Sequence, residues 1–126
     1  MISKKFLDNV SGVAAVEFAF TAPLFLLGLL ATFQLGMWMW TQVGLQHGAE
    51  MAARCATINP AVCGSPAAVQ QFAVGQAFGL NLPATTFSFS QSSCGNLVSA
   101  SYAFPNFAPY LNLPSFDIRA SSCFPV

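Results

Sequence analysis

The side chains most able to do chemistry in this 126-residue chain are one carboxylate that opens a long apolar run and four cysteines that follow it. Glu17 precedes residues 18–46, a stretch with no charged residue. As a helix this stretch spans about 43 Å, more than the roughly 30 Å hydrocarbon core of a bilayer. A carboxylate entering hydrocarbon is costly unless it snorkels to the headgroups or meets a cation. The sequence therefore predicts a membrane helix with an acidic side chain near its start.

The four cysteines all lie beyond the apolar run. An even number of cysteines in a short domain outside a membrane predicts two disulfides in an oxidising compartment. Of the three possible pairings we favour Cys55–Cys63 with Cys94–Cys123, one local link and one long-range link worth roughly 3–4 kcal/mol. Free thiols and a zinc site are the alternatives, and zinc is disfavoured because no pair has CxxC spacing.

Composition restricts the class of protein. Hydrophobic residues make up 55% of the chain and charged residues 6%, against about a quarter charged in soluble domains. The net charge is zero, and Arg54 and Arg119 are the only cations after Lys5, so nucleic-acid binding is not expected. Because the chain has no phosphate loop, nucleophile elbow, paired carboxylates or metal-ligand cluster, we predict no enzymatic activity, no metal and no cofactor.

The short polar stretch 1–12 predicts the orientation of the chain. Lys4 and Lys5 precede the apolar run, so the positive-inside rule places the N-terminus in the cytoplasm and the C-terminal part outside. The run is about twice as long as the 7–15-residue apolar core of a secretory signal peptide. We therefore expect a retained anchor, not a removed signal.

Gly12 followed by four apolar residues and Glu17, at the start of a long apolar helix, resembles the processing site of type IV prepilins. The pattern continues through Phe18 and Pro23 into a Leu/Phe run and an Ala-rich helical end at Ile58. These features, in this order along the chain, resemble TadE-like proteins, the minor pilin-like subunits of tight-adherence (Tad/Flp) pilus systems. Phe18 in place of the Tyr usual in major Flp pilins fits the minor branch.

The resemblance implies a processing site and a set of partners. A prepilin peptidase would cut between Gly12 and Val13, and Glu17 would pair with a new N-terminal amine during assembly, with Phe18 beside it. The partners would be other pilin subunits, the peptidase and the inner-membrane pilus assembly platform. The protein would lie in the bacterial inner membrane, with its C-terminal domain in the periplasm or in the extracellular pilus. The alternative is an uncleaved single-pass anchor whose periplasmic domain binds a partner, with Glu17 snorkelling.

Several residues predict how the long helix packs. Pro23 removes one backbone hydrogen bond, so a bend is expected there. Trp38 and Trp40 are expected at the outer membrane interface. Three small residues four apart, Gly44, Gly48 and Ala52, allow close approach of another helix, either of a second subunit or of the protein's own domain.

Beyond the membrane we expect a water-exposed helical stalk up to Ile58. Glu50 and Arg54 would form a solvated pair on it, and His47 would be an interfacial polar residue.

The remaining sequence predicts a small α+β domain. Ser65 and Pro66 begin a helix that runs to Phe78, with Gly79 as its C-cap. Alternating apolar residues predict three antiparallel strands, at 85–90, 97–104 and 116–124. The loop 105–114 carries Phe107 and Tyr110, which either cover the core or bind a partner. The expected organisation is a leader over 1–12, a helix over 13–58 that is transmembrane at about 18–40, and a disulfide-linked exported domain over 59–126.

Overall fold

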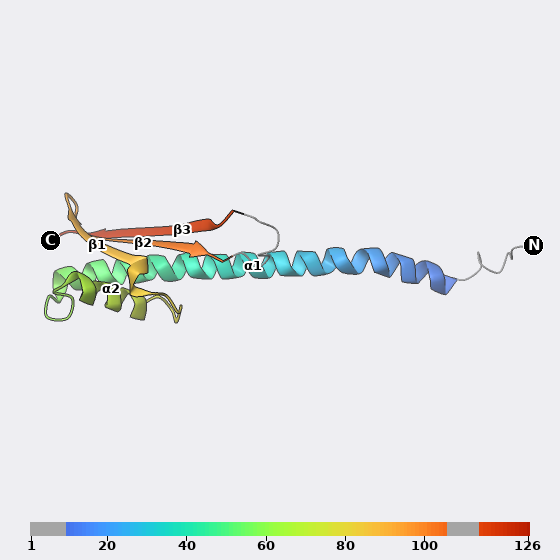
Figure 1. Cartoon of the computed structure of the whole chain (residues 1–126), viewed down its shortest axis with the longest axis horizontal. Helices are drawn as coiled ribbons and strands as arrows, with labels where there is room; N and C mark the ends of the chain where they lie inside the picture. Colours follow the sequence, from blue (N-terminus) through green and yellow to red (C-terminus); the bar gives the residue numbers. More distant parts are fainter. Residues whose placement is uncertain (1–9, 106–113) are drawn as a thin grey trace, which may run out of the picture. The chain divides into compact units, whose positions relative to one another are not determined.

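The computed structural model describes residues 10–105 and 114–126, and it contains two compact units. One unit ends at Gly36 and the other covers Met37–Val126. The elements in chain order are α1 (Val10–Ile58), α2 (Pro66–Gly75), a 3-10 turn η2 (Ala84–Thr86), β1 (Phe87–Ser92), β2 (Gly95–Phe104) and β3 (Phe116–Phe124) (Figure 1). The predicted α+β class is confirmed. Lys4, Lys5, Phe107 and Tyr110 lie outside the described residues.

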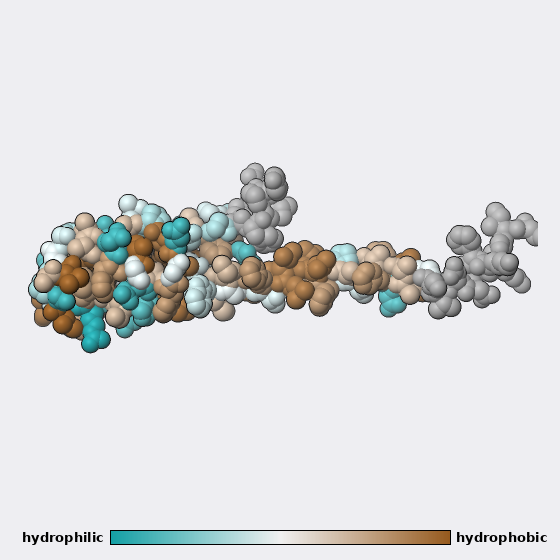
Figure 2. Space-filling view, turned by 90° about the horizontal axis from the view of Figure 1, so that it is seen from below, coloured by the Kyte–Doolittle hydropathy of each residue, from teal (hydrophilic) through white to brown (hydrophobic). Residues whose placement is uncertain are grey.

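The unit that ends at Gly36 is a single apolar stretch of α1. Helix α1 continues through Pro23, and just before it the Thr21 hydroxyl donates to the carbonyl oxygen of Glu17 at 3.0 Å. The large side chains from Val13 to Leu35 are exposed, and Figure 2 shows this part of α1 mostly in brown. The most apolar stretch of α1 contains no buried residue. By length and composition, α1 can therefore cross a membrane.

In the Met37–Val126 unit, the end of α1 belongs to the core. Leu45, Ala49, Ala52 and Ala53 are all fully buried. The expectation of a water-exposed stalk is therefore wrong for this face of α1, because its small side chains let the rest of the unit pack directly against the helix. The unit accordingly begins at Met37, not after Ile58.

Helix α2 begins as predicted and ends earlier. The Ser65 hydroxyl accepts a hydrogen bond from the backbone N–H of Ala68 at 3.2 Å, which caps the first turn. The helix ends at Gly75, and Gln76, not Gly79, is its C-cap. The predicted end was wrong because it was placed at Gly79: Phe78 and Gly79, with φ angles of 50° and 73°, belong to the turn that follows the helix.

The sheet is antiparallel with strand order β1-β2-β3. The predicted alternation is confirmed: the inner face supplies core residues, namely Phe87, Val98, Ala100, Ile118 and Ala120. By its register Phe116 lies on this face too, but its side chain is 61% exposed. It is the first residue of β3, where its neighbour across the ladder is Phe104, the last residue of β2. The core does not extend beyond that final pair.

Two disulfides join parts of this unit, and both coincide with the pairs favoured from the sequence. Cys55–Cys63 closes the turn after α1, and Cys94–Cys123 ties the β1–β2 turn to β3. The described residues contain no free cysteine. Both links lie outside the apolar unit that ends at Gly36.

Candidate functional site

The sequence motif around Glu17 lies on the first turns of α1. The helix begins at Val10, so Gly12, Val13 and Glu17 are all helical. Val13 is 66% exposed and Phe18 is 71% exposed, and Glu17 is exposed between them. Within the described part of the chain, no side chain partners the Glu17 carboxylate. The motif therefore presents a single acid on an otherwise apolar surface.

Gly12 has no packing role within the described structure. A Cβ atom built at this position meets nothing within 4 Å. Glycine within a helix costs about 1 kcal/mol relative to alanine. The fold therefore gives no reason for a glycine at position 12.

The small residues Gly44, Gly48 and Ala52 pack inside the protein's own domain. A Cβ at Gly44 would lie 2.6 Å from the Leu80 side chain, and one at Gly48 would lie 2.8 Å from the carbonyl oxygen of Ala73. Ala52 is fully buried. Of the two interpretations left open by the sequence, packing within the domain is the one found. This face of α1 is not free to receive a helix from another subunit.

His47 also contacts its own domain. Its Nδ1–H donates to the carbonyl oxygen of Gln76 at 3.0 Å, and its ring stacks on Phe78 with centroids 4.5 Å apart. Trp40 also contacts Phe78, with ring centroids 6.0 Å apart. His47, predicted as an interfacial polar residue, is therefore half-buried against its own domain. The aromatic partner Phe78 was not anticipated.

Two glutamines of α1 bind the outer edge of β3. Gln42 Nε2 donates to the carbonyl oxygen of Arg119 at 3.1 Å, and Gln46 Nε2 donates to that of Ser121 at 3.3 Å. Because the residue numbers increase together, β3 runs in the same direction as α1. These hydrogen bonds satisfy backbone acceptors that an edge strand would otherwise leave open.

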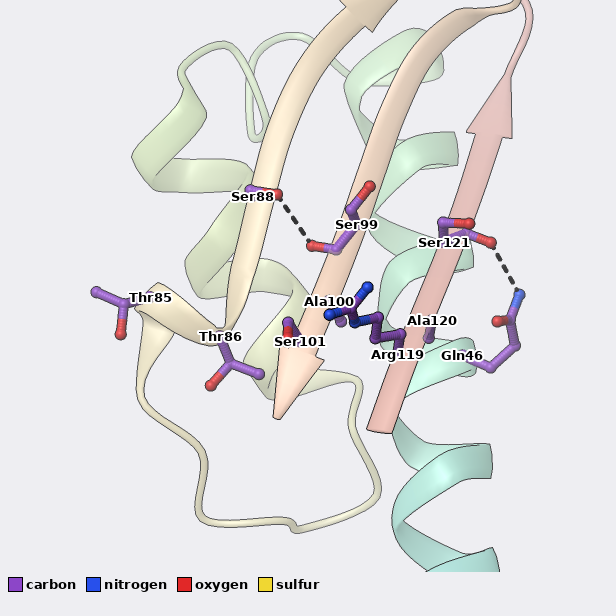
Figure 3. Close-up of a pocket in the computed structure, with 10 residues that line it drawn as sticks. All are labelled: Gln46, Thr85, Thr86, Ser88, Ser99, Ala100, Ser101, Arg119, Ala120 and Ser121. Carbon is purple, nitrogen blue, oxygen red and sulfur yellow. Dashed lines mark hydrogen bonds between the residues drawn. The ribbon is translucent and has the colours of Figure 1, made fainter. Parts of the chain in front are cut away.

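The outer face of the sheet forms an open polar groove of about 640 Å³ (Figure 3). Its lining is rich in hydroxyl groups, from Thr85, Thr86, Ser88, Ser99, Ser101 and Ser121. Figure 3 shows the Arg119 side chain lying across the same face. The Arg119 guanidinium has no partner among the described residues. A cation surrounded by hydroxyls can bind an anionic or hydroxylated group.

Among the described residues, the groove is lined by hydroxyl groups, one glutamine, two alanines and one arginine. Its lining contains no histidine, cysteine or carboxylate, so a nucleophile in it would have no base. In the described ranges, no group of three His, Cys, Asp or Glu side chains could hold a metal ion. The sequence signal for the groove was the alternation of serines on the strands, which predicted only a solvent-facing side.

A comparison with protein families matches one segment of the chain. Residues 12–54 match the family model described as TadE-like protein. The match begins at Gly12, includes Glu17 and the small residues of α1, and stops before α2 and the sheet. No curated protein and no solved structure matches the chain.

Proposed function

We propose that this chain, which belongs to the TadE-like protein family through residues 12–54, is a minor pilin or pseudopilin of a tight-adherence (Tad/Flp) pilus. It is made as an inner-membrane prepilin with its N-terminus in the cytoplasm. A prepilin peptidase cuts it between Gly12 and Val13, and the mature chain acts in pilus assembly or adhesion. The observation that carries the proposal is the family match, which begins at Gly12, the residue directly before the proposed cleavage point.

The open surroundings of Gly12 support processing at this bond. A side chain at position 12 would meet nothing in the described structure, so the protein's own packing does not require glycine. A residue that costs the helix stability and fills no packing role fits a requirement imposed by another protein. A peptidase that must approach the backbone closely imposes such a requirement.

The spacing from Val13 to Glu17 supports an assembly role for the carboxylate. Positions four apart lie on the same face of a helix, about one turn apart. After cleavage, the new amine of Val13 would therefore lie near Glu17, in the same chain or in a neighbour packed alongside. An amine and a carboxylate that enter hydrocarbon together compensate each other, whereas either alone resists insertion.

The exposed apolar part of α1 supports contacts with other subunits. Large side chains such as Phe20, Leu24 and Phe25 are exposed, in a stretch that contains no charge. In the membrane they would face lipid, and in a fibre they would pack against the helices of other pilins. The expected partners are those subunits, the prepilin peptidase and the inner-membrane assembly platform. The proposed role needs no cofactor.

The test is the mass and N-terminal sequence of the protein purified from its native membrane, for the wild type and for Gly12→Leu. We expect the wild-type chain to begin at Val13 and the variant to retain residue 1. Gly28→Leu is the matched control, because Gly28 also lies in α1 with nothing within 4 Å of a built Cβ. It should be processed normally. A wild-type chain that begins at Met1 in cells containing the peptidase would contradict the proposal.

The polar groove favours one alternative function. An uncleaved, membrane-anchored protein could use the unpaired Arg119 and the hydroxyls around it to bind a periplasmic partner. In that case Glu17 only snorkels to the headgroups, and the wild type and Gly12→Leu both begin at Met1, so their masses differ only by the substituted side chain. The same experiment therefore separates the two functions.

A further inference from the structure

Three exposed aromatic side chains gather at one end of the Met37–Val126 unit. Trp40 and Phe78, 55% and 47% exposed, have ring centroids 6.0 Å apart. Phe116 lies toward the same end, because β3 runs alongside α1 in the same direction and Phe116 is its first residue. We call Trp40, Phe78 and Phe116 the aromatic end.

The opposite end of the unit differs in the kind of apolar side chain it exposes. Ile58 and Val62 are exposed where α1 ends, and they are aliphatic. Within the described part of this unit, the exposed aromatic residues are those of the aromatic end together with Trp38. Aromatic rings prefer the boundary between lipid headgroups and acyl chains, where aliphatic side chains have no such preference.

The backbone conformation of Phe78 and a stacking contact keep its side chain exposed. The residue has a φ of 50°, a left-handed conformation that costs a side chain about 1–2 kcal/mol. His47 stacks on one side of the ring and is fixed by its hydrogen bond to the carbonyl oxygen of Gln76. The turn therefore keeps a large apolar ring at the surface at a cost to the backbone.

The surroundings of the aromatic end carry no charge where it meets α1 and the turn after α2. Residues 18–46 are free of charge, and so are residues 66–116. Trp40 also lies at the end of the stretch, about 18–40, that the sequence predicts to span the membrane. Asp117 and Arg119, which follow Phe116 in β3, are the exposed charged residues near the aromatic end, and Trp40 and Phe78 have none beside them in the sequence. Exposed aromatic rings at the end of a predicted membrane segment fit a lipid interface better than water.

We propose that the aromatic end seats the exported domain on the outer headgroup–acyl boundary of the membrane. The proposal rests on the membrane anchoring of the proposed function and adds a second contact with lipid. The domain is then held in a fixed orientation before assembly. Moving the subunit from the membrane into a fibre must separate these rings from lipid.

The test is lipid quenching of a single tryptophan in the full chain. Trp38→Phe and Trp40→Phe provide a tryptophan-free background, into which Phe78→Trp, Val62→Trp or Leu27→Trp is introduced separately. Each protein is reconstituted in phosphatidylcholine vesicles with bromine on the upper acyl chain. We expect emission from position 78 to fall to about half and emission from position 27 to fall as well, with position 62 unchanged. Val62 is the matched control, because it is 53% exposed.

The possible failures can be distinguished. Quenching at position 27 without quenching at position 78 would overturn the membrane seat and leave membrane anchoring intact. Absence of quenching at position 27 would contradict the anchoring as well. If emission at position 78 depends on the protein-to-lipid ratio but not on bromine, a second copy covers the ring. That result also overturns the proposal. A free-thiol assay shows whether Phe78→Trp still forms both disulfides. If it does not, Phe116→Trp is used in its place, and the same quenching is expected.

Discussion

The two halves of α1 are equally helical but differ in the size of their side chains. From residue 12 to residue 36 the helix carries leucines and phenylalanines that are exposed in the structure. From Thr41 onward it carries a face of small residues, including Gly44, Gly48 and Ala52, against which α2 and the sheet pack. One half is suited to lipid or other subunits, and the other belongs to the core of the Met37–Val126 unit.

This difference shows that side-chain volume, not hydropathy, separates the two roles. Both halves contain apolar residues, and a hydropathy window alone assigns the helix as one membrane segment. Close approach of another element requires small side chains, because a Cβ at Gly48 would already meet the backbone of α2. Large apolar side chains that meet nothing in their own chain point to a partner outside it.

The largest expected effect comes from shortening the same residue type in each half. Leu45 is fully buried, and Leu45→Ala should lower the free energy of unfolding of the domain by about 3 kcal/mol, through lost burial and the cavity left behind. Leu27 is 61% exposed, and Leu27→Ala should leave that free energy unchanged. Chemical denaturation in detergent, followed by near-ultraviolet circular dichroism, measures both. Equal effects of the two changes would remove the distinction between the halves.

A smaller effect should follow from adding one methyl group. Gly48→Ala gains about 1 kcal/mol of helix propensity, but its methyl would lie 2.8 Å from the Ala73 carbonyl oxygen and 3.0 Å from Phe87. We expect a net loss of about 1–3 kcal/mol from the forced displacement of α2. Gly28→Ala, with open space around it, should not destabilise the domain. The midpoint of thermal unfolding shows whether each variant is more or less stable than the wild type. A higher midpoint for Gly48→Ala would contradict the close packing.

The smallest effect concerns the contact between α1 and the edge of β3. Gln46→Ala removes the hydrogen bond to the Ser121 carbonyl oxygen, which should cost about 0.5–1.5 kcal/mol. Gln71→Ala is the control, because Gln71 is exposed in α2 and has no such contact among the described residues. Amide hydrogen exchange in β3 should accelerate in the first variant only. Unchanged exchange would show that the glutamine does not hold the strand.

Much of the fold was predictable because local signals agree with the final structure. Alternating phenylalanines and serines predicted β1, and Ser65 with Pro66 predicted the start of α2. The spacing of Gly44 and Gly48 indicated close packing but could not identify the partner, because a second subunit and the protein's own domain require the same small residues. The stalk was mispredicted for that reason.

Other features depend on contacts between distant residues. The groove around Arg119 forms from three strands and a residue of α1, so no single segment signals it. Phe78 reads as the end of a helix, and its exposed position depends on His47, about thirty residues earlier. The proposed processing site at Gly12 is the reverse case: its sequence signal is local, and the proposed role requires a protein outside this chain.

The hydrogen bonds from Gln42 and Gln46 have a consequence for aggregation. Proteins crowded in a membrane at high local concentration risk pairing their sheet edges into cross-β oligomers. In this domain α1 occupies the Arg119 and Ser121 carbonyl oxygens on the outer edge of β3, so incoming strands find those acceptors already satisfied. Copies can then come together through their helices without strand pairing at the β3 edge.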